Sequence, residues 1–307
     1  MFFLLILSCQ KLASLSEKMI NDLPNYVRVG QILEDSDGSC FEMGEKLGGG
    51  SCGQVFEGCF WKKNGERENV YAVKLVQYEP GEECEAEREV EMLKICQNVE
   101  NIVVLQKSFD VMINDQNFKL MAFERMGPSL ESLTRHRILS VPNCLKIGYT
   151  LLQVFSDLKK LGVIHQDLHS ENVMFCHDLK HMKLGDFGDA EKAKRNKNVH
   201  RDAKCYSYGF DAASVLFLLS CCRTDIKNIK NRNCTTSAYL NELKAVKEGL
   251  LDNNMLFLQG FTDELLIQVR DSNVSYSKLR HALISSSATF SPSDNFIVTN
   301  DVPPMLA

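Results

Sequence analysis

Three polar side chains, Asp167, Asn172 and Asp186, have types and a spacing that suit a reaction centre. Asp167 and Asn172 belong to the stretch His-Gln-Asp-Leu-His-Ser-Glu-Asn at 165–172, and Asp186 opens the sequence Asp-Phe-Gly. Two short apolar runs separated by polar residues lie between them, at 173–184, and predict a strand–turn–strand hairpin that brings the three side chains together. One carboxylate there can accept a proton, while an amide oxygen and a second carboxylate can hold a hard cation.

A glycine-rich stretch upstream predicts a loop that approaches phosphate groups. Gly48, Gly50 and Gly53 lie between two strand-like patterns, and glycine is needed because a Cβ would block both the turn and the close approach of a ligand. The pattern G-x-G-x-x-G also occurs in dinucleotide-binding folds, where a helix must follow the glycines. Residues 54–58 have the pattern of a strand instead, which favours a flap over a nucleotide.

Lys74 interrupts an otherwise apolar strand pattern at 70–76. It could be an edge-strand lysine whose stem packs and whose ammonium reaches water, but its place one strand after the glycines favours a phosphate-binding role. A Glu-rich helix is predicted from 82 to about 96, and Glu89 lies on its inward stripe. A carboxylate on the buried side needs a cation, for which Lys74 is the natural candidate. Glu85, one turn earlier, is the alternative.

In this order, the motifs resemble those of eukaryotic protein kinases over roughly residues 41–283. The resemblance implies an α+β fold with two lobes and ATP in the cleft between them. The small lobe, at about 41–123, would be a mostly antiparallel sheet with one helix, and the larger lobe, at about 128–283, mainly helical. Residues 1–40 would form an N-terminal extension. Residues 284–307, rich in Ser, Thr, Pro and Asp, are predicted to be a disordered tail.

The resemblance also implies a role for each residue of the centre. The reaction would transfer the γ-phosphoryl group of Mg–ATP to Ser or Thr hydroxyls of a protein substrate. Asp167 would orient the acceptor hydroxyl and take its proton. Lys74, placed by Glu89, would hold the phosphates, and Asn172 and Asp186 would bind Mg²⁺.

The nucleotide is expected to contact both strands of the glycine flap, the lysine strand and the hinge between the lobes. Phe123 would lie at the back of the adenine pocket, and the backbone of Glu124 and Met126 would bond the adenine. The residues expected to contact ATP are Leu47, Gly48, Gly50, Ser51, Gly53, Val55, Ala72, Lys74, Phe123, Glu124 and Met126.

Two helical patterns are predicted to support the centre. Residues from about 142 to 161 are amphipathic and precede Gly162, which predicts a helix that delivers the chain to 165–172. Residues 209–222 are almost entirely apolar, as is typical of a helix buried on all sides. In the kinase reading, Asp211 on this helix ties back to the catalytic loop.

The sequence departs from the common kinase pattern at several points. His169 replaces the lysine typical of Ser/Thr kinases; a neutral imidazole can donate one bond to the γ-phosphate but adds no full charge. Asp-Leu-His at 167–169 resembles haspin-type kinases, while Gly-Pro-Ser-Leu at 127–130 resembles the casein kinase 1 group. Gln166 stands where many kinases have arginine, and no Ala-Pro-Glu motif is present. A pseudokinase that keeps the fold is therefore the alternative to an active enzyme, and a small-molecule phosphotransferase is a third class.

Composition limits the partners. The 44% hydrophobic and 24% charged content is that of a soluble globular protein, and a net charge of −5 gives no general attraction to nucleic acid or anionic membrane. Twelve cysteines lack zinc-site spacing, which indicates free thiols in the cytoplasm or nucleus. The apolar run at 2–7 is too short to span a bilayer; a signal peptide, a packing segment and a mis-assigned start remain open. A monomer is expected. The basic residues at 192–204 would be either a solvated loop or a site for acidic or already phosphorylated peptides.

Overall fold

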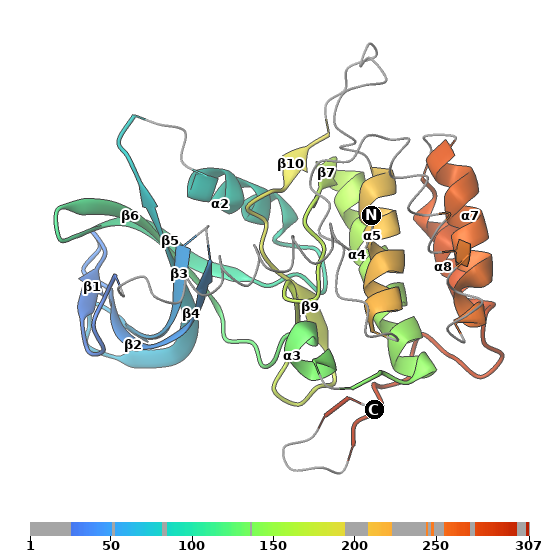
Figure 1. The fold of residues 1–307 in the computed structure, drawn as a ribbon. Coiled ribbons are helices and arrows are strands. Elements are labelled where there is room, and N and C mark those ends of the chain that lie inside the picture. Colours follow the sequence, from blue (N-terminus) through green and yellow to red (C-terminus); the bar gives the residue numbers. More distant parts are fainter. Residues whose placement is uncertain are drawn as a thin grey trace, which may run out of the picture. The chain divides into compact units, whose positions relative to one another are not determined.

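The chain forms two compact units in a computed structural model (Figure 1), one of residues Met1–Glu91 and Val104–Arg125, the other of Met92–Val103 and Met126–Ala307. The structure describes residues 26–50, 53–81, 85–135, 137–193, 208–222, 244, 247–248, 255–270, 274–299 and 305–306. Three features singled out in the sequence lie outside these residues: the predicted phosphate-loop residue Ser51, the apolar run at 2–7 and most of the basic stretch at 192–204.

The first unit is built on one six-stranded sheet of order β1-β2-β3-β4-β6-β5, in which all neighbours are antiparallel. The strands are β1 (Ile32–Glu34), β2 (Cys40–Gly50), β3 (Gly53–Trp61), β4 (Arg67–Tyr78), β5 (Leu105–Ile113) and β6 (Gln116–Glu124). A helix, α2 (Glu85–Cys96), follows β4 along the chain. This arrangement agrees with the antiparallel small lobe that the resemblance implies, and β3 confirms that a strand rather than a helix follows the glycines.

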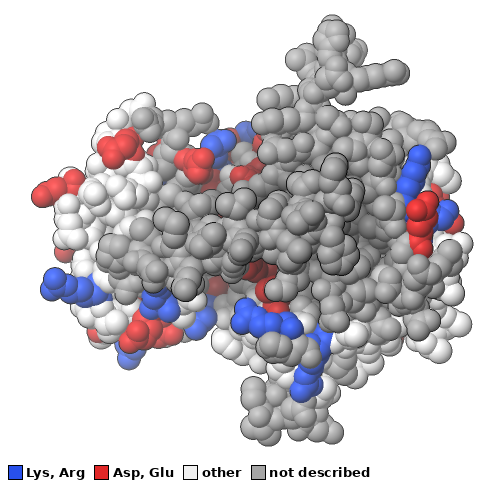
Figure 2. Space-filling model, viewed as in Figure 1, with Lys and Arg blue, Asp and Glu red and all other residues white. Residues whose placement is uncertain are grey.

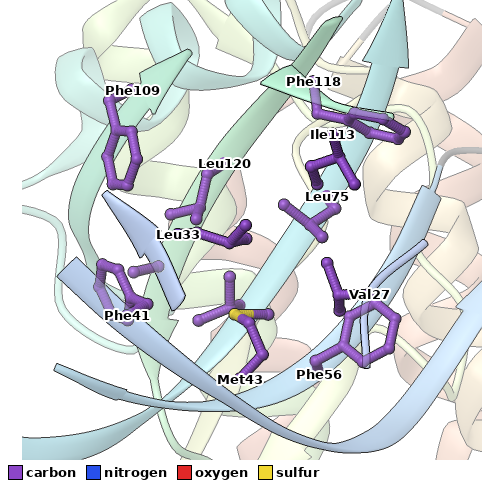
Figure 3. Close-up of a cluster of buried hydrophobic side chains, with 12 residues drawn as sticks. Val27, Leu33, Phe41, Met43, Phe56, Leu75, Phe109, Ile113, Phe118 and Leu120 are labelled. Atoms are coloured by element: carbon purple, nitrogen blue, oxygen red, sulfur yellow. The ribbon is translucent and has the colours of Figure 1, made fainter. Parts of the chain in front are cut away.

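The two faces of the sheet have different cores. Inward side chains from all six strands, together with Val27, form the cluster in Figure 3, which includes Phe41, Phe56 and Leu75. Each fully buried side chain of this size contributes about 1.5–3 kcal/mol. Met121 of β6 points to the other face, where it packs with Ala86 and Val90 of α2. The helix therefore covers the face that carries alternate residues of β4 and β6.

The sheet begins earlier than the sequence predicts. Composition and motifs place the boundary at residue 40, but β1 pairs with β2, and Leu33 belongs to the core cluster. The backbone N–H of Tyr26 donates to Gln54 Oε1 at 3.1 Å, and its ring lies 4.8 Å from that of Phe118. The sequence contains no periodic pattern here because β1 is three residues long and buries one side chain.

Residues 101–105, which the sequence predicts to be one strand, are divided: residues 101–103 pair within the second unit. Leu184 donates to the carbonyl of Asn101 at 2.8 Å, and Val103 donates to the carbonyl of Leu184 at 2.9 Å. Only Leu105 belongs to a strand, as the first residue of β5. A run of apolar residues without alternation specifies burial but does not specify a partner, so its neighbour was not predictable.

The second unit is mainly helical, with two short antiparallel sheets. Its helices are α3 (Leu130–Thr134), α4 (Val141–Leu161), α5 (Tyr208–Cys221), the 3₁₀ turn η1 (Leu256–Leu258), α7 (Gln259–Arg270) and α8 (Tyr276–Ile284). The strands are β7 (Val163–Ile164) with β10 (Glu191–Lys192), and β8 (Val173–Phe175) with β9 (Met182–Leu184).

Helix α4 is the central element of this unit, with α5 and α8 packed against it (Figure 1). It begins with a proline in its first turn and ends at Gly162, whose φ of 73° is the left-handed conformation that terminates helices. A Cβ added at Gly148 would lie 2.8 Å from Leu219 of α5 and 3.0 Å from Leu283 of α8. The predicted helices at about 142–161 and 209–222 agree with α4 and α5 to within one residue.

The structure of the C-terminal tail differs from the disorder that the sequence predicts for residues 284–307. Residues 285–299 and 305–306 lie among the described residues, and Phe290, Phe296 and Leu306 are buried. Local composition could not indicate this, because these apolar residues follow no helix or strand period and are buried only by contacts with distant elements.

The described surface carries charges of both signs. On the face seen in Figure 2, lysine and arginine side chains are interspersed with aspartate and glutamate. Among the described residues, no helix has the length and apolar character needed to cross a bilayer.

Candidate active site

A buried ion pair joins β4 to α2 in the first unit. Lys74 Nζ lies 2.7 Å from Glu89 Oε2, and the two side chains are 12% and 4% exposed. The sequence left Glu85 as an alternative partner, but its side chain is 70% exposed and lies near Arg88. Because α2 is packed on β6 through Val90 and Met121, the carboxylate of Glu89 is held in place and fixes the position of the Lys74 ammonium.

The strand register aligns the glycine flap with Lys74. Gly48 of β2 is opposite Val55 of β3, and Val55 is opposite Lys74 of β4. Residues directly opposite in antiparallel strands project to the same face, so this row brings the flap and the ammonium to one side of the sheet. Two residues before Lys74, Ala72 shares that face and is opposite Phe123 of β6.

The three glycines of the flap serve different purposes. A Cβ added at Gly48 or Gly50 would meet nothing within 4 Å, so these positions leave open backbone that a phosphate can approach. At Gly53, φ is +124° and a Cβ would lie 2.4 Å from the carbonyl oxygen of Leu75. Gly53 is therefore required by the fold of the hairpin itself.

Gly53→Ala is expected to lower the free energy of unfolding by roughly 1–3 kcal/mol, because the left-handed backbone is strained for alanine and the new methyl would meet β4. Gly48→Ala is the matched control, since its methyl enters open space, and we expect an unchanged melting temperature but weaker ATP binding. Thermal melts and nucleotide titration of the two variants measure both effects. Equal melting temperatures for the two variants would contradict this assignment.

The predicted hinge residues are divided between the units. The backbone N–H of Glu124 donates to the carbonyl of Val104 at 3.2 Å, and its side chain accepts from the N–H of Val104 at 2.7 Å. The N–H of Glu124 is thus already bonded within the first unit. Met126 belongs to the second unit and is buried, whereas Leu47 is partly exposed.

In the second unit, the hairpin β8–β9 brings together the catalytic-loop and Asp-Phe-Gly residues. The strands cover the residues predicted from the sequence, and Gly185 donates to the carbonyl of Asn172 at 2.8 Å. The side-chain amide of Asn172 donates to the backbone carbonyl of Asp167 at 2.9 Å and to its carboxylate at 3.3 Å. Asp186, next to Gly185, has a φ of 56° and accepts from the N–H of Gly188 at 3.3 Å.

Asn172 and Asp186 suit a magnesium ion. The nitrogen of the Asn172 amide is committed to Asp167, so its oxygen faces the other way as a neutral ligand, and Asp186 supplies a carboxylate. Within the described residues, no group of three His, Cys, Asp or Glu side chains forms a metal cage. Mg²⁺ commonly binds through one or two protein oxygens and takes the rest from water and phosphate, which these two residues fit.

His169 lies against the predicted base. Its Nε2 is 3.3 Å from Asp167 Oδ2, and its Nδ1 is 3.4 Å from Glu171 Oε2. The latter geometry makes no hydrogen bond, and Nδ1 is buried without a hydrogen-bond partner. From the sequence, this imidazole is expected to donate a bond to the γ-phosphate; in this structure it lies against the carboxylate of Asp167, the predicted base.

The catalytic loop is anchored to α5 by Asp211. The fully buried carboxylate accepts from the backbone N–H of His165 at 3.0 Å and from that of Gln166 at 2.9 Å. Burial raises the pKa of Asp211, although the two backbone hydrogen bonds act in the opposite direction. Gln166 has a φ of 69°, a left-handed conformation that these two bonds hold in place.

His165 is a positioning residue that sequence reasoning did not identify. Its Nδ1 accepts from the N–H of Asp167 at 3.3 Å, and its Nε2 donates to the carbonyl of Gly185 at 3.1 Å. The edge of the ring meets Phe187, with centroids 4.8 Å apart. The imidazole thus links the base to the Asp-Phe-Gly loop. Its position two residues before Asp167 was the one available indication.

Comparison with known proteins agrees with this geometry. A model described as "Protein kinase domain" matches residues 41–228, which is more than half of the chain. Human ribosomal protein S6 kinase alpha-4 is 28% identical over 175 residues, 55% of this chain and 21% of that protein. Caenorhabditis elegans homeodomain-interacting protein kinase 1 is 28% identical over 185 residues, 57% and 21% of the two chains. Schizosaccharomyces pombe serine/threonine-protein kinase cds1 is 27% identical over 130 residues, 42% and 27%.

The matches cover about a fifth to a quarter of the length of these relatives. They support neither the casein kinase 1 likeness of 127–130 nor the haspin-like character of 167–169. They do support a transferase that uses ATP and a divalent metal, as the domain generally does. By the matched span of 41–228, this chain belongs to the protein kinase domain family.

Proposed function

We propose that this chain is an active protein kinase that transfers the γ-phosphoryl group of ATP, in the presence of Mg²⁺, to Ser or Thr hydroxyls of protein substrates. The observation that carries the proposal is the arrangement at β8–β9, where the Asn172 amide bonds Asp167 beside the loop that presents Asp186. These are the side chains that a base and a metal site require, and they come from separate segments of the chain.

In the proposed reaction, the acceptor hydroxyl oxygen bonds to the γ-phosphorus while the bond from that phosphorus to the β–γ bridging oxygen breaks. The hydroxyl proton passes to the Asp167 carboxylate, and ADP leaves with the bridging oxygen. Asn172 and Asp186 would hold Mg²⁺, and the bound ion would neutralise charge at the phosphates. In the first unit, Lys74, oriented by Glu89, would bind the phosphates of ATP. Catalysis of this kind depends mainly on positioning and electrostatics.

Specificity for Ser and Thr is supported by a relative that is named a serine/threonine-protein kinase. We further propose a preference for acidic or already phosphorylated peptides, which rests on the basic residues at 192–204. A monomeric state and a cytoplasmic or nuclear location are also proposed. A panel of peptides with acidic, phosphorylated or basic flanks would test the substrate preference.

A pseudokinase is the second candidate, and His169 is the observation that favours it. Its Nε2 lies 3.3 Å from the Asp167 carboxylate, where a hydrogen bond would compete with the acceptor hydroxyl for the same oxygen. His169→Ala separates the two readings, because it should increase transfer if the imidazole blocks the base and leave transfer equal or lower if the imidazole assists.

The proposed function is tested by transfer of labelled γ-phosphate from Mg–ATP to casein and to the protein itself. We expect transfer that EDTA abolishes and excess Mg²⁺ restores, with label on phosphoserine and phosphothreonine after acid hydrolysis. ATP binding in a thermal-shift assay without transfer would favour the pseudokinase. Transfer to choline or an aminoglycoside, with none to protein, would indicate a small-molecule phosphotransferase.

A further inference from the structure

The C-terminal segment contacts α4 and β8 through three of its residues, Pro292, Phe296 and Ile297. Phe296 is 7% exposed, and its ring packs edge-on against that of Phe175, with centroids 5.2 Å apart. The side chain of Asn143, in the first turn of α4, pairs with the backbone of Ile297. It donates to the carbonyl of Ile297 at 2.9 Å and accepts from its N–H at 2.8 Å.

The third contact comes before this pair in the chain, and the bonds after the pair join the segment to itself. Lys146, one turn further along α4, donates to the carbonyl of Pro292, and burial lowers the pKa of Lys146. After Ile297, Val298 bridges to Leu306, and Thr299 donates to the carbonyl of Met305 at 2.7 Å. Leu306 is almost fully buried. The segment is therefore attached to α4 by side-chain bonds to its backbone and to β8 by an aromatic contact, and it buries apolar side chains of its own.

The aromatic contact reaches the catalytic hairpin. Phe175 is the last residue of β8, three residues after Asn172, and is fully buried. Its backbone is bonded to the segment after the hinge, with its N–H donating to Pro128 at 2.9 Å and its carbonyl accepting from Gly127 at 2.7 Å. The ring of Phe296 thus packs on the residue that joins β8 to the segment preceding α3.

We propose that residues 290–299 and 305–306, here called the tail strap, hold β8 in the position that presents Asn172 to Asp167. The strap lies outside the span that matches the kinase domain model, 41–228. Its effect on catalysis rests on the proposed function, but its effect on β8 does not.

Phe296→Ala tests the strap in the full chain. Burying a phenylalanine side chain corresponds to a factor of about 10–100 in an equilibrium constant, so we expect cleavage of the tail by a protease to accelerate by about that factor. Amide exchange should also accelerate at Phe175, whose N–H is bonded to Pro128. We expect kcat to fall roughly 10–100-fold, because small misplacements of a reacting group are costly, with KM for ATP unchanged.

Asn143→Ala releases the strap from the opposite side, by removing both bonds to Ile297, and should reproduce these effects. Ile297→Ala is the matched control: its side chain is 45% exposed, and its backbone bonds to Asn143 remain. Phe296→Leu, which keeps part of the buried surface, should restore most of the protection and kcat. Circular dichroism and thermal melts check that each variant is folded.

The outcomes separate the strap from the proposed function. Faster exchange at Phe175 in Phe296→Ala and Asn143→Ala, but not in Ile297→Ala, supports the strap even if the wild-type protein transfers no phosphate. Unchanged exchange at Phe175 in both variants overturns it. If the wild-type protein is active, release of the tail with an unchanged kcat overturns the link between the strap and catalysis.

Discussion

Asp167→Asn is expected to lower kcat for phosphoryl transfer by about 10²–10⁴-fold, the usual contribution of a positioned base. The amide cannot take the proton of the acceptor hydroxyl, but it has nearly the shape of the carboxylate. The carboxamide can still accept the bond from Asn172, which lies 3.3 Å from Oδ2 in the wild type. The variant should therefore fold normally and bind ATP as well as the wild type.

The measurement is the initial rate of labelled phosphate transfer at saturating Mg–ATP, beside a thermal melt with and without nucleotide. Glu171→Gln is a suitable control, because its carboxylate lies on the other side of His169, 3.4 Å from Nδ1, and is not expected to act as the base. If Asp167→Asn keeps more than about a tenth of the wild-type kcat, Asp167 does not act as the base, because a positioned base contributes about 10²–10⁴-fold.

Asp211→Ala is expected to destabilise the second unit by roughly 2–6 kcal/mol, since it leaves two backbone N–H groups without an acceptor at a cost of about 1–3 kcal/mol each. These groups belong to His165 and Gln166. Without their acceptor, the left-handed backbone of Gln166 loses its restraint, and the loop that holds Asp167 should lose its order. We expect loss of activity together with a large fall in the urea midpoint.

Asp211→Asn is the matched control for this prediction. It keeps the size of the side chain and one oxygen acceptor, so it should lose less stability than the alanine variant. Urea unfolding of the three proteins at one pH compares them directly. Equal stability of Asp211→Ala and the wild type would mean that other groups satisfy the two N–H donors.

The difference in stability between the wild type and Asp211→Asn also reports the ionisation of Asp211. Burial raises the pKa of Asp211 in the folded state, so its contribution to stability is fully present below the ordinary aspartate value of about 3.9 and declines as the pH rises through the folded pKa. Asn does not titrate. The advantage of the wild type over Asp211→Asn should therefore shrink as the pH is raised from about 4.

Local patterns in the sequence determined much of the candidate active site. The residues of β8 and β9 and the ends of α4 and α5 followed from apolar runs, polar turns and a terminal glycine, because these depend on neighbours in sequence. Lys74 and Glu89 were also identifiable, since a charged residue inside an apolar pattern must find a partner on folding. The resemblance to kinases then ordered these pieces, but it did not indicate that His169 lies 3.3 Å from the carboxylate of Asp167.

Only the tertiary structure decided how distant segments meet. The row of Gly48, Val55 and Lys74 depends on strand register, which a one-residue slip would destroy. The short strand β1, the pairing of 101–103 with Leu184 and the attachment of Phe296 to Phe175 join segments that are far apart in the chain. No periodicity of a few residues can encode such contacts, because their energy comes from surfaces that become neighbours only when the whole chain folds.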